Sequence, residues 1–171
     1  MAVKSLIETV TVGAGGATSI EFTDIPQDGS DLVLAVSSRV NLMNVTLSLR
    51  VNSNTSSIYT DIYLQGNGAS ASSANLTASY LNVGVTSISS DTANTFGNAN
   101  FYFPNYTSVA NKSFSGDSVS ETNGTYAYQR IVAGLLATTS PITSVAIAPI
   151  GFGAYIFEQH STASLYKIKY D

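Results

Sequence analysis

Short runs of alternating apolar and polar residues follow one another along the chain, and this pattern constrains the fold more than any other feature. The segments FYFPNY, YAYQRIVAGLLA and SVAIAPIGFGAYIF show it, and Gly, Asn, Ser or Pro separate such runs. A period of two with turn residues between the runs is typical of β-strands joined by tight connections. No segment has convincing helical periodicity. The sequence therefore predicts an all-β protein of about ten to twelve short strands.

Two segments of the N-terminal half indicate how the strands are used. Residues 45–51 are apolar at odd positions and polar at even ones, which predicts a strand with one wet face. Residues 31–40 begin apolar on both faces and turn polar toward Arg39, so we expect a strand in the centre of its sheet. GAGG at 13–16 lies between two strand-like segments and predicts a hairpin turn.

Length and composition favour a single domain over residues 1–171 that is stabilised by packing, without disulfide bonds. A chain of 171 residues can bury about 70% of its unfolded surface, and it contains no cysteine for disulfides or thiolate ligands. Hydrophobic residues make up 44%, too many for a disordered chain. Closely spaced antiparallel strands at this size predict a two-sheet sandwich, jelly-roll-like in the first place. An immunoglobulin-like sandwich is the alternative, but it has fewer strands and would not use all of the residues.

The charge pattern argues against nucleic acid and membrane partners. Only seven Lys and Arg stand in a chain of net charge −4, so no basic stripe for phosphates is expected. No apolar run approaches the length of a membrane span, and MAVKSLIETVTV lacks the apolar core of a signal peptide. We therefore expect a protein made in a cytoplasm.

Candidate catalytic and metal-binding groups do not converge in the sequence. His160 is the single histidine, no G-x-S-x-G motif occurs, and Asp24, Asp28 and Asp31 lack the calcium-loop spacing. Asp117 and Glu121 share a strand face, about 13 Å apart, beyond the usual separation of glycosidase carboxylates. We expect no catalytic residue, no metal site and no cofactor.

Partner contacts are the remaining functional hypothesis. Ten tyrosines suit protein interfaces and sugar platforms, although core packing takes most of them. The small-residue tract around 66–73 predicts a surface loop, and GFGAYIFEQH at 151–160 a second contact loop. The final strand carries two lysines on one face, which indicates an edge strand or a site for an acidic partner. The candidate contact residues are Tyr155, Phe157, His160, Lys167 and Lys169.

Several segments together resemble a family of small jelly-roll virion proteins of tailed bacteriophages. They are TSIEFTDIPQDGSDLVLAVSSR, FYFPNYTS, NKSFSGDSVSETN, IVAGLLATTSPITSVAIAP and HSTASLYKIK, and the likeness covers nearly the whole chain. Its motifs are strand and turn patterns without a catalytic signature. The resemblance implies a protein on the virion surface, as a capsid decoration, head-fibre or tail-surface module and commonly as a trimer.

Three functions follow as expectations. The first is a capsid decoration or head-fibre protein that binds the major capsid protein, other virion proteins and its own copies. The second is a tail receptor-binding or carbohydrate-binding module that contacts a host-surface glycan. The third is a small glycan hydrolase, for which the sequence supplies no convergent carboxylates.

Overall fold

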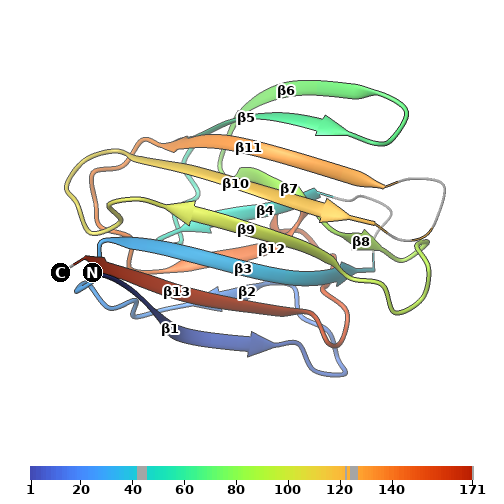
Figure 1. Ribbon diagram of the computed structural model, residues 1–171, viewed down its shortest axis with the longest axis horizontal. Coiled ribbons are helices and arrows are strands. Elements are labelled where there is room, and N and C mark those ends of the chain that lie inside the picture. Colours follow the sequence, from blue (N-terminus) through green and yellow to red (C-terminus); the bar gives the residue numbers. More distant parts are fainter. Residues whose placement is uncertain (42–45, 122, 124–126, 171) are drawn as a thin grey trace.

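The chain folds as a β-sandwich of a large and a small antiparallel sheet (Figure 1). The computed structural model describes residues 1–41, 46–121, 123 and 127–170, so Val45 of the predicted strand 45–51 lies outside the described residues. These residues form thirteen strands and one 3₁₀ turn, η1 (Ile150–Phe152). The predicted all-β sandwich is confirmed, with one strand more than expected.

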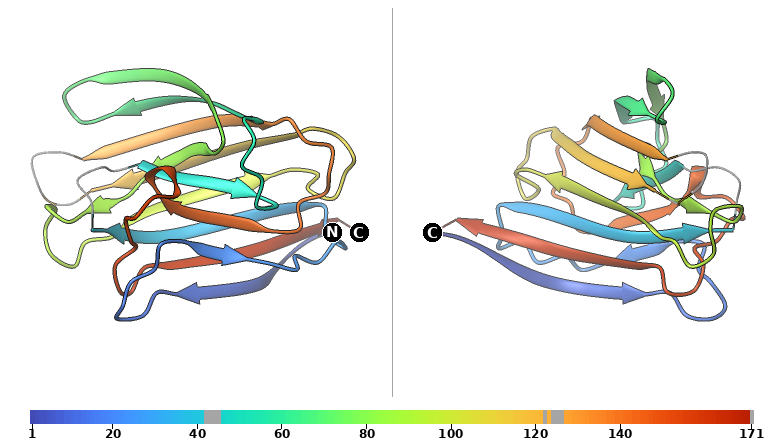
Figure 2. Two further views of the ribbon diagram at one scale, coloured as in Figure 1. Left: turned by 180° about the vertical axis from the view of Figure 1, so that it is seen from behind. Right: turned by 45° about the vertical axis from the view of Figure 1, so that its right-hand side comes forward.

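The large sheet runs through eight strands in one path, and β8 (Ser87–Ile88) pairs beside β3 off this path. In spatial order the path is β1 (Ala2–Thr11), β13 (Thr162–Tyr170), β3 (Asp31–Val40), β9 (Gly97–Phe103), β10 (Lys112–Ser120), β11 (Tyr128–Leu136), β5 (Tyr59–Gly66) and β6 (Ala71–Ala78). The small sheet has the order β2 (Ile20–Phe22), β12 (Val145–Pro149), β4 (Thr46–Val51) and β7 (Leu81–Val85). Seen from behind, the small sheet covers one face of the large one (Figure 2).

The strand order is that of a jelly roll with additions. The chain changes sheet at each step from β2 to β5, returns to the small sheet for β7, and comes back once more for β12. The strands β1–β13–β3–β9 of the large sheet and the small sheet β2–β12–β4–β7 have the strand order of the two jelly-roll sheets, and the hairpin β5–β6 and strands β10 and β11 are the additions. β1 and β13 belong to the sandwich, since Ala163 and Leu165 of β13 are buried in its core and Ile7 and Val10 of β1 pack against that core. The predicted central position of residues 31–40 is confirmed, since β3 lies between β13 and β9.

The core lies between the two inner faces. Leu32 and Leu34 of β3 are fully buried, as are Leu47 and Leu49 of β4 opposite. Three phenylalanines of the meander form its centre, with ring centroids 5.6 Å apart for Phe103 and Phe114 and 6.1 Å for Phe101 and Phe114. Alternation in the sequence fixes which side chains enter this layer because successive residues of a strand point to opposite faces.

Three sequence-based predictions about local structure are wrong. GAGG forms a turn, with Gly16 at φ 71°, but the strands it joins lie in different sheets: β1 pairs with β13, and β2 with β12. The tract around 66–73, whose small side chains suggested a loop, is a tight turn followed by strand β6. Pairing with β5 satisfies the backbone hydrogen-bonding groups of β6. Ser48 is buried on the face predicted to be wet, because η1 covers it and the Gly151 amide donates to its Oγ at 2.9 Å.

Candidate interaction surface

The outer face of the large sheet is the most extended feature on which no described strand packs. In Figure 1 it faces the viewer, with β6 at the top and β1 at the bottom, and the small sheet lies behind it. Eight strands about 4.8 Å apart, with about four outward residues each, give an area on the order of 800 Å². One partner of a standard protein interface contributes about the same area.

One end of this face is apolar, over strands β5 and β11. Ile62, Leu64, Ile131 and Leu135 point outward with exposed fractions of 58%, 51%, 56% and 44%. The register places Leu64 opposite Ile131, and Ile62 opposite Ala133, so these side chains form one continuous group. We call Ile62, Leu64, Ile131, Ala133 and Leu135 the apolar patch. Such a contiguous exposed group is a feature of binding surfaces.

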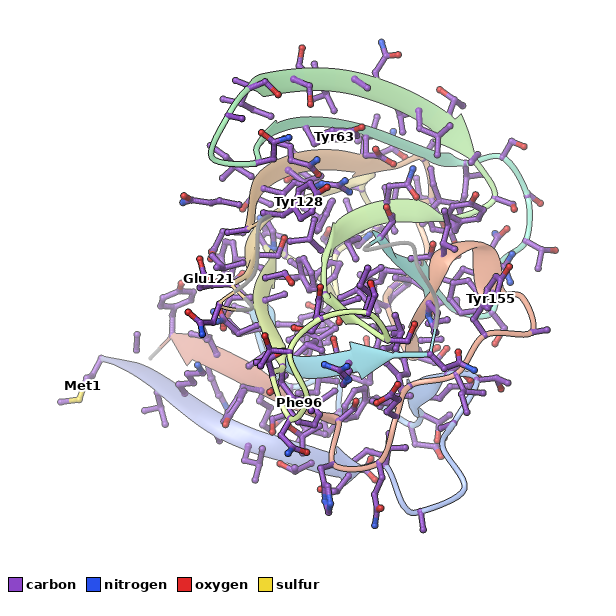
Figure 3. The ribbon with its side chains drawn as sticks, turned by 90° about the vertical axis from the view of Figure 1, so that its right-hand side faces the viewer. Met1, Tyr63, Phe96, Glu121, Tyr128 and Tyr155 are labelled. Carbon is purple, nitrogen blue, oxygen red and sulfur yellow. The ribbon has the colours of Figure 1, made fainter. Side chains whose placement is uncertain are left out.

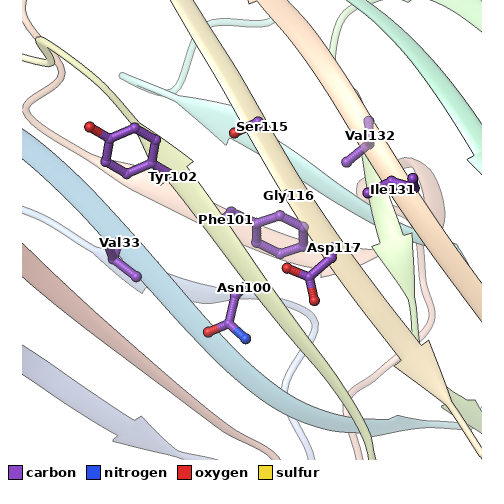
Figure 4. A pocket seen from close by; sticks show the side chains of 9 residues that line it. All are labelled: Val33, Asn100, Phe101, Tyr102, Ser115, Gly116, Asp117, Ile131 and Val132. Atoms are coloured by element: carbon purple, nitrogen blue, oxygen red, sulfur yellow. The ribbon is translucent and has the colours of Figure 1, made fainter.

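A shallow hollow of about 300 Å³ lies beside the apolar patch, above strands β9 and β10 (Figure 4). Asp117 stands opposite Asn100, and Ser115 stands opposite Tyr102, while Val33 and Ile131 line the two sides. The structure gives neither Asp117 nor Asn100 a side-chain hydrogen bond among the described residues. Their polar atoms are therefore available to a bound group.

The Tyr102 side chain at the hollow is held in place by a buried carboxylate. Asp31, 4% exposed, accepts hydrogen bonds from the hydroxyls of Tyr102 at 2.7 Å and Tyr170 at 2.8 Å, and from the Asn105 amide at 2.9 Å. Burial raises the pKa of Asp31, but the three hydrogen bonds outweigh it and hold that pKa below its usual value. The carboxylate in turn raises the pKa of Tyr102. The ring is thus fixed before any ligand arrives.

We expect Asp31→Asn to lower the free energy of unfolding at neutral pH by about 2 kcal/mol, since charge-assisted hydrogen bonds are lost. The folded-state pKa of Asp31 lies below its unfolded value of about 3.9, so its contribution is complete above that value and disappears as the pH falls through the folded-state pKa. Urea unfolding of both proteins between pH 7 and pH 2 checks this. A stability difference that stays constant into acid would contradict it.

The five candidate contact residues do not form one surface. Phe157 is fully buried in the core, where its backbone bridges to Ala17 and Val40, so its assignment as a contact is wrong. Tyr155 is 41% exposed and lies on the loop after η1, on the small-sheet side of the molecule (Figure 3). His160 is exposed at the turn before β13, with φ 74°. This loop lies away from the apolar patch.

Lys167 and Lys169 lie near the other end of β13, on the face opposite to the outer face. Lys167 makes a salt bridge of 2.5 Å with Asp28, whose pKa is lowered by this hydrogen bond, and Lys169 is exposed. The prediction that these lysines mark an edge strand is wrong. β13 lies between β1 and β3, because β1 adds to the sheet outside it.

The other chemical candidates are not brought together. Asp117 points outward from the middle of β10, whereas Glu121 follows the end of that strand and accepts the Asn123 amide at 2.7 Å. In the part of the chain that the structure describes, no group of three or more His, Cys, Asp or Glu is placed to hold a metal ion. None of the helical segments described there is long and apolar enough to cross a membrane.

Sequence reasoning missed the apolar patch, although a signal was present. In residues 128–136, Ile131, Ala133 and Leu135 alternate with Val132 and Leu136, so both faces of the strand are apolar. A strand of this kind is ordinarily covered on both faces. Here one face packs in the core and the other is exposed. Apolar residues on a second face are therefore the pattern that points to a binding surface.

Comparison with known proteins adds no identification. No protein-family model, no curated protein and no solved structure matches the chain.

Proposed function

We propose that the protein is a structural component of the virion of a tailed bacteriophage, a capsid decoration or head-fibre protein. It binds the shell and its own copies through β-sandwich surfaces and performs no catalysis. The resemblance of its strand and turn segments to small jelly-roll virion proteins supports the phage assignment, and the jelly-roll strand order agrees with it. The observation that carries the binding role is the uncovered outer face of the large sheet.

The chemistry of that face fits a protein surface. Among the exposed outward side chains of strands β5, β11, β10, β9 and β3, all of them described, Asp117 alone carries a charge. Docking would therefore desolvate few charges, and the apolar patch would supply the hydrophobic centre of the interface. A lattice of identical subunits could hold many copies, one at each equivalent position. The partner is therefore a protein surface that is apolar and carries few charges, such as the capsid lattice.

Quantitative mass spectrometry of purified particles tests the proposal. A decoration or head-fibre protein should be present in many copies per particle, in a fixed ratio to the major capsid protein. Fewer than about a dozen copies, the number of fivefold positions of an icosahedral shell, would contradict this role. Cryo-electron microscopy of the same particles would place the protein on the head or on the tail.

The hollow favours a second candidate, a tail module that binds a host-surface glycan. The fixed Tyr102 side chain and the unpaired polar groups of Asp117, Asn100 and Ser115 form a small set of convergent polar and aromatic groups, as ligand sites require. A glycan array would show selective binding that Asp117→Ala abolishes. Absence of any signal, or binding that Asp117→Ala leaves unchanged, would remove this candidate.

A further inference from the structure

Strand β6 leaves one edge of the large sheet open. It pairs with β5 over its whole length, from Tyr59 opposite Ala78 to Gly66 opposite Ala71, and no described strand pairs with its other side. Its sequence, ASSANLTA, leaves residues 71–75 exposed on both faces. Alternate residues therefore direct backbone N–H and C=O groups outward from the end of the sheet, where another strand can accept and donate hydrogen bonds.

This edge lacks the features by which proteins prevent strand pairing. Charged side chains, proline, bulges and short length are the usual means. β6 has eight residues, no charge, no proline and a continuous register with β5. The opposite edge, β1, carries Lys4 and Glu8 and has a register irregularity between Leu6 and Glu8. The contrast within one sheet indicates that β1 is protected from pairing and that β6 is not.

We propose that β6 pairs with β6 of a second copy of this chain, antiparallel and about a twofold axis perpendicular to the sheet. The charge pattern favours a second copy as the partner. Asp61 is the single charged residue between positions 51 and 90, and it is buried, so self-pairing brings no like charges together. The small side chains of Ala, Ser and Thr let the two backbones approach. Pairing centred on Ala74 or Asn75 leaves every residue opposite a neutral one.

The symmetry fixes what the dimer presents. A twofold axis perpendicular to the sheet keeps both outer faces on the same side, and such isologous pairing closes at two copies. The eight-strand paths then join into one continuous sheet. The two apolar patches face the same way on both sides of the axis, because β5 is next to β6 in each copy. The resulting assembly is a dimer, in place of the trimer that the family resemblance implies. This inference does not depend on where the protein acts.

Light scattering after size-exclusion chromatography tests the proposal on the full chain. The wild type should have twice the monomer mass of 17.9 kDa at micromolar concentration. Asn75→Lys places two ammonium groups at the axis and should raise the dissociation constant at least tenfold, on the order of the effect of like charges set opposite in a sheet. Ser113→Lys, which adds the same charge on the inner strand β10, should leave the dimer intact.

A mixing experiment separates pairing from misfolding. Asn75→Lys and Asn75→Glu should each be monomeric, and an equimolar mixture should form the dimer again because opposite charges then meet at the axis. A monomeric wild type, a trimer, or a mixture that stays monomeric would overturn the proposal. So would equal loss of the dimer in Ser113→Lys.

Discussion

Replacing Arg39 with methionine is expected to lower the free energy of unfolding by about 3 kcal/mol, because the hydrogen bonds that its buried guanidinium donates are lost. The Arg39 side chain is 8% exposed, and its Nε donates to the Glu158 carboxylate at 3.0 Å. Its two terminal nitrogens donate to the carbonyls of four residues in the connection after β8, at 3.0–3.3 Å: Ser89, Asp91, Thr92 and Thr95. One side chain thus organises the connection that covers this end of β3.

Two further variants locate the cause of this loss. Arg39→Lys should recover only a small part of the stability, because an ammonium group cannot reproduce the fork of donors that reaches Glu158 and the carbonyls together. Arg50→Met is the matched control: Arg50 donates to the Ser79 carbonyl at 3.0 Å and stacks on Phe152, and it should cost about 1 kcal/mol. Urea unfolding measures all three. Equal losses for Arg39→Met and Arg50→Met would contradict the assignment.

Replacing Ile131 with aspartate is expected to weaken binding to the partner lattice by about 100-fold, as for a residue in the centre of an interface. Ile131 is 56% exposed, lies between Leu64 and Asp117 in the register, and borders both the apolar patch and the hollow. A second carboxylate beside Asp117 would have to be desolvated on docking. The new carboxylate stands directly opposite Asp117 and replaces a β-branched residue, so we expect a loss of folding stability of about 1–2 kcal/mol, which leaves the protein folded for the binding measurement.

Binding of the purified protein to particles assembled without it measures this effect. Val109→Asp is the control, since Val109 is 81% exposed on the connection between β9 and β10, outside the apolar patch. It should bind as the wild type does. Equal binding of Ile131→Asp and the wild type would show that the outer face is not the docking surface, and the function proposed for it would fail.

The fold class could be predicted from the sequence because the evidence for it is local. Alternation in residues such as 31–40 and 145–149 specifies strands whatever their neighbours are, and the inner residues, among them Leu34 and Ile147, enter the core as the pattern requires. Turn residues such as Gly16 were also identified, since a positive φ is a property of one residue. The strand partners were not, because pairing joins segments far apart in the chain.

The binding surface depends on what covers each strand face. Tyr155 and His160 looked accessible and are, whereas Phe157, two residues from Tyr155, enters the core. Ile131 and Val132 are equally apolar in the sequence, and only the position of the small sheet makes one exposed and the other buried. The same holds for Arg39, whose burial comes from a connection that lies some fifty residues later in the chain, as its bonds to residues 89–95 show.

By itself, the sequence determined that this chain forms strands and that these strands pack in two layers without disulfides. It also contains no recognisable catalytic motif. These follow from residue types and a period of two, which act over a few neighbouring residues. The tertiary structure decided which strands meet, which edge stays open at β6, and which apolar face of β5 and β11 remains exposed. Those properties arise from contacts between distant segments, and a residue's own chemistry does not contain them.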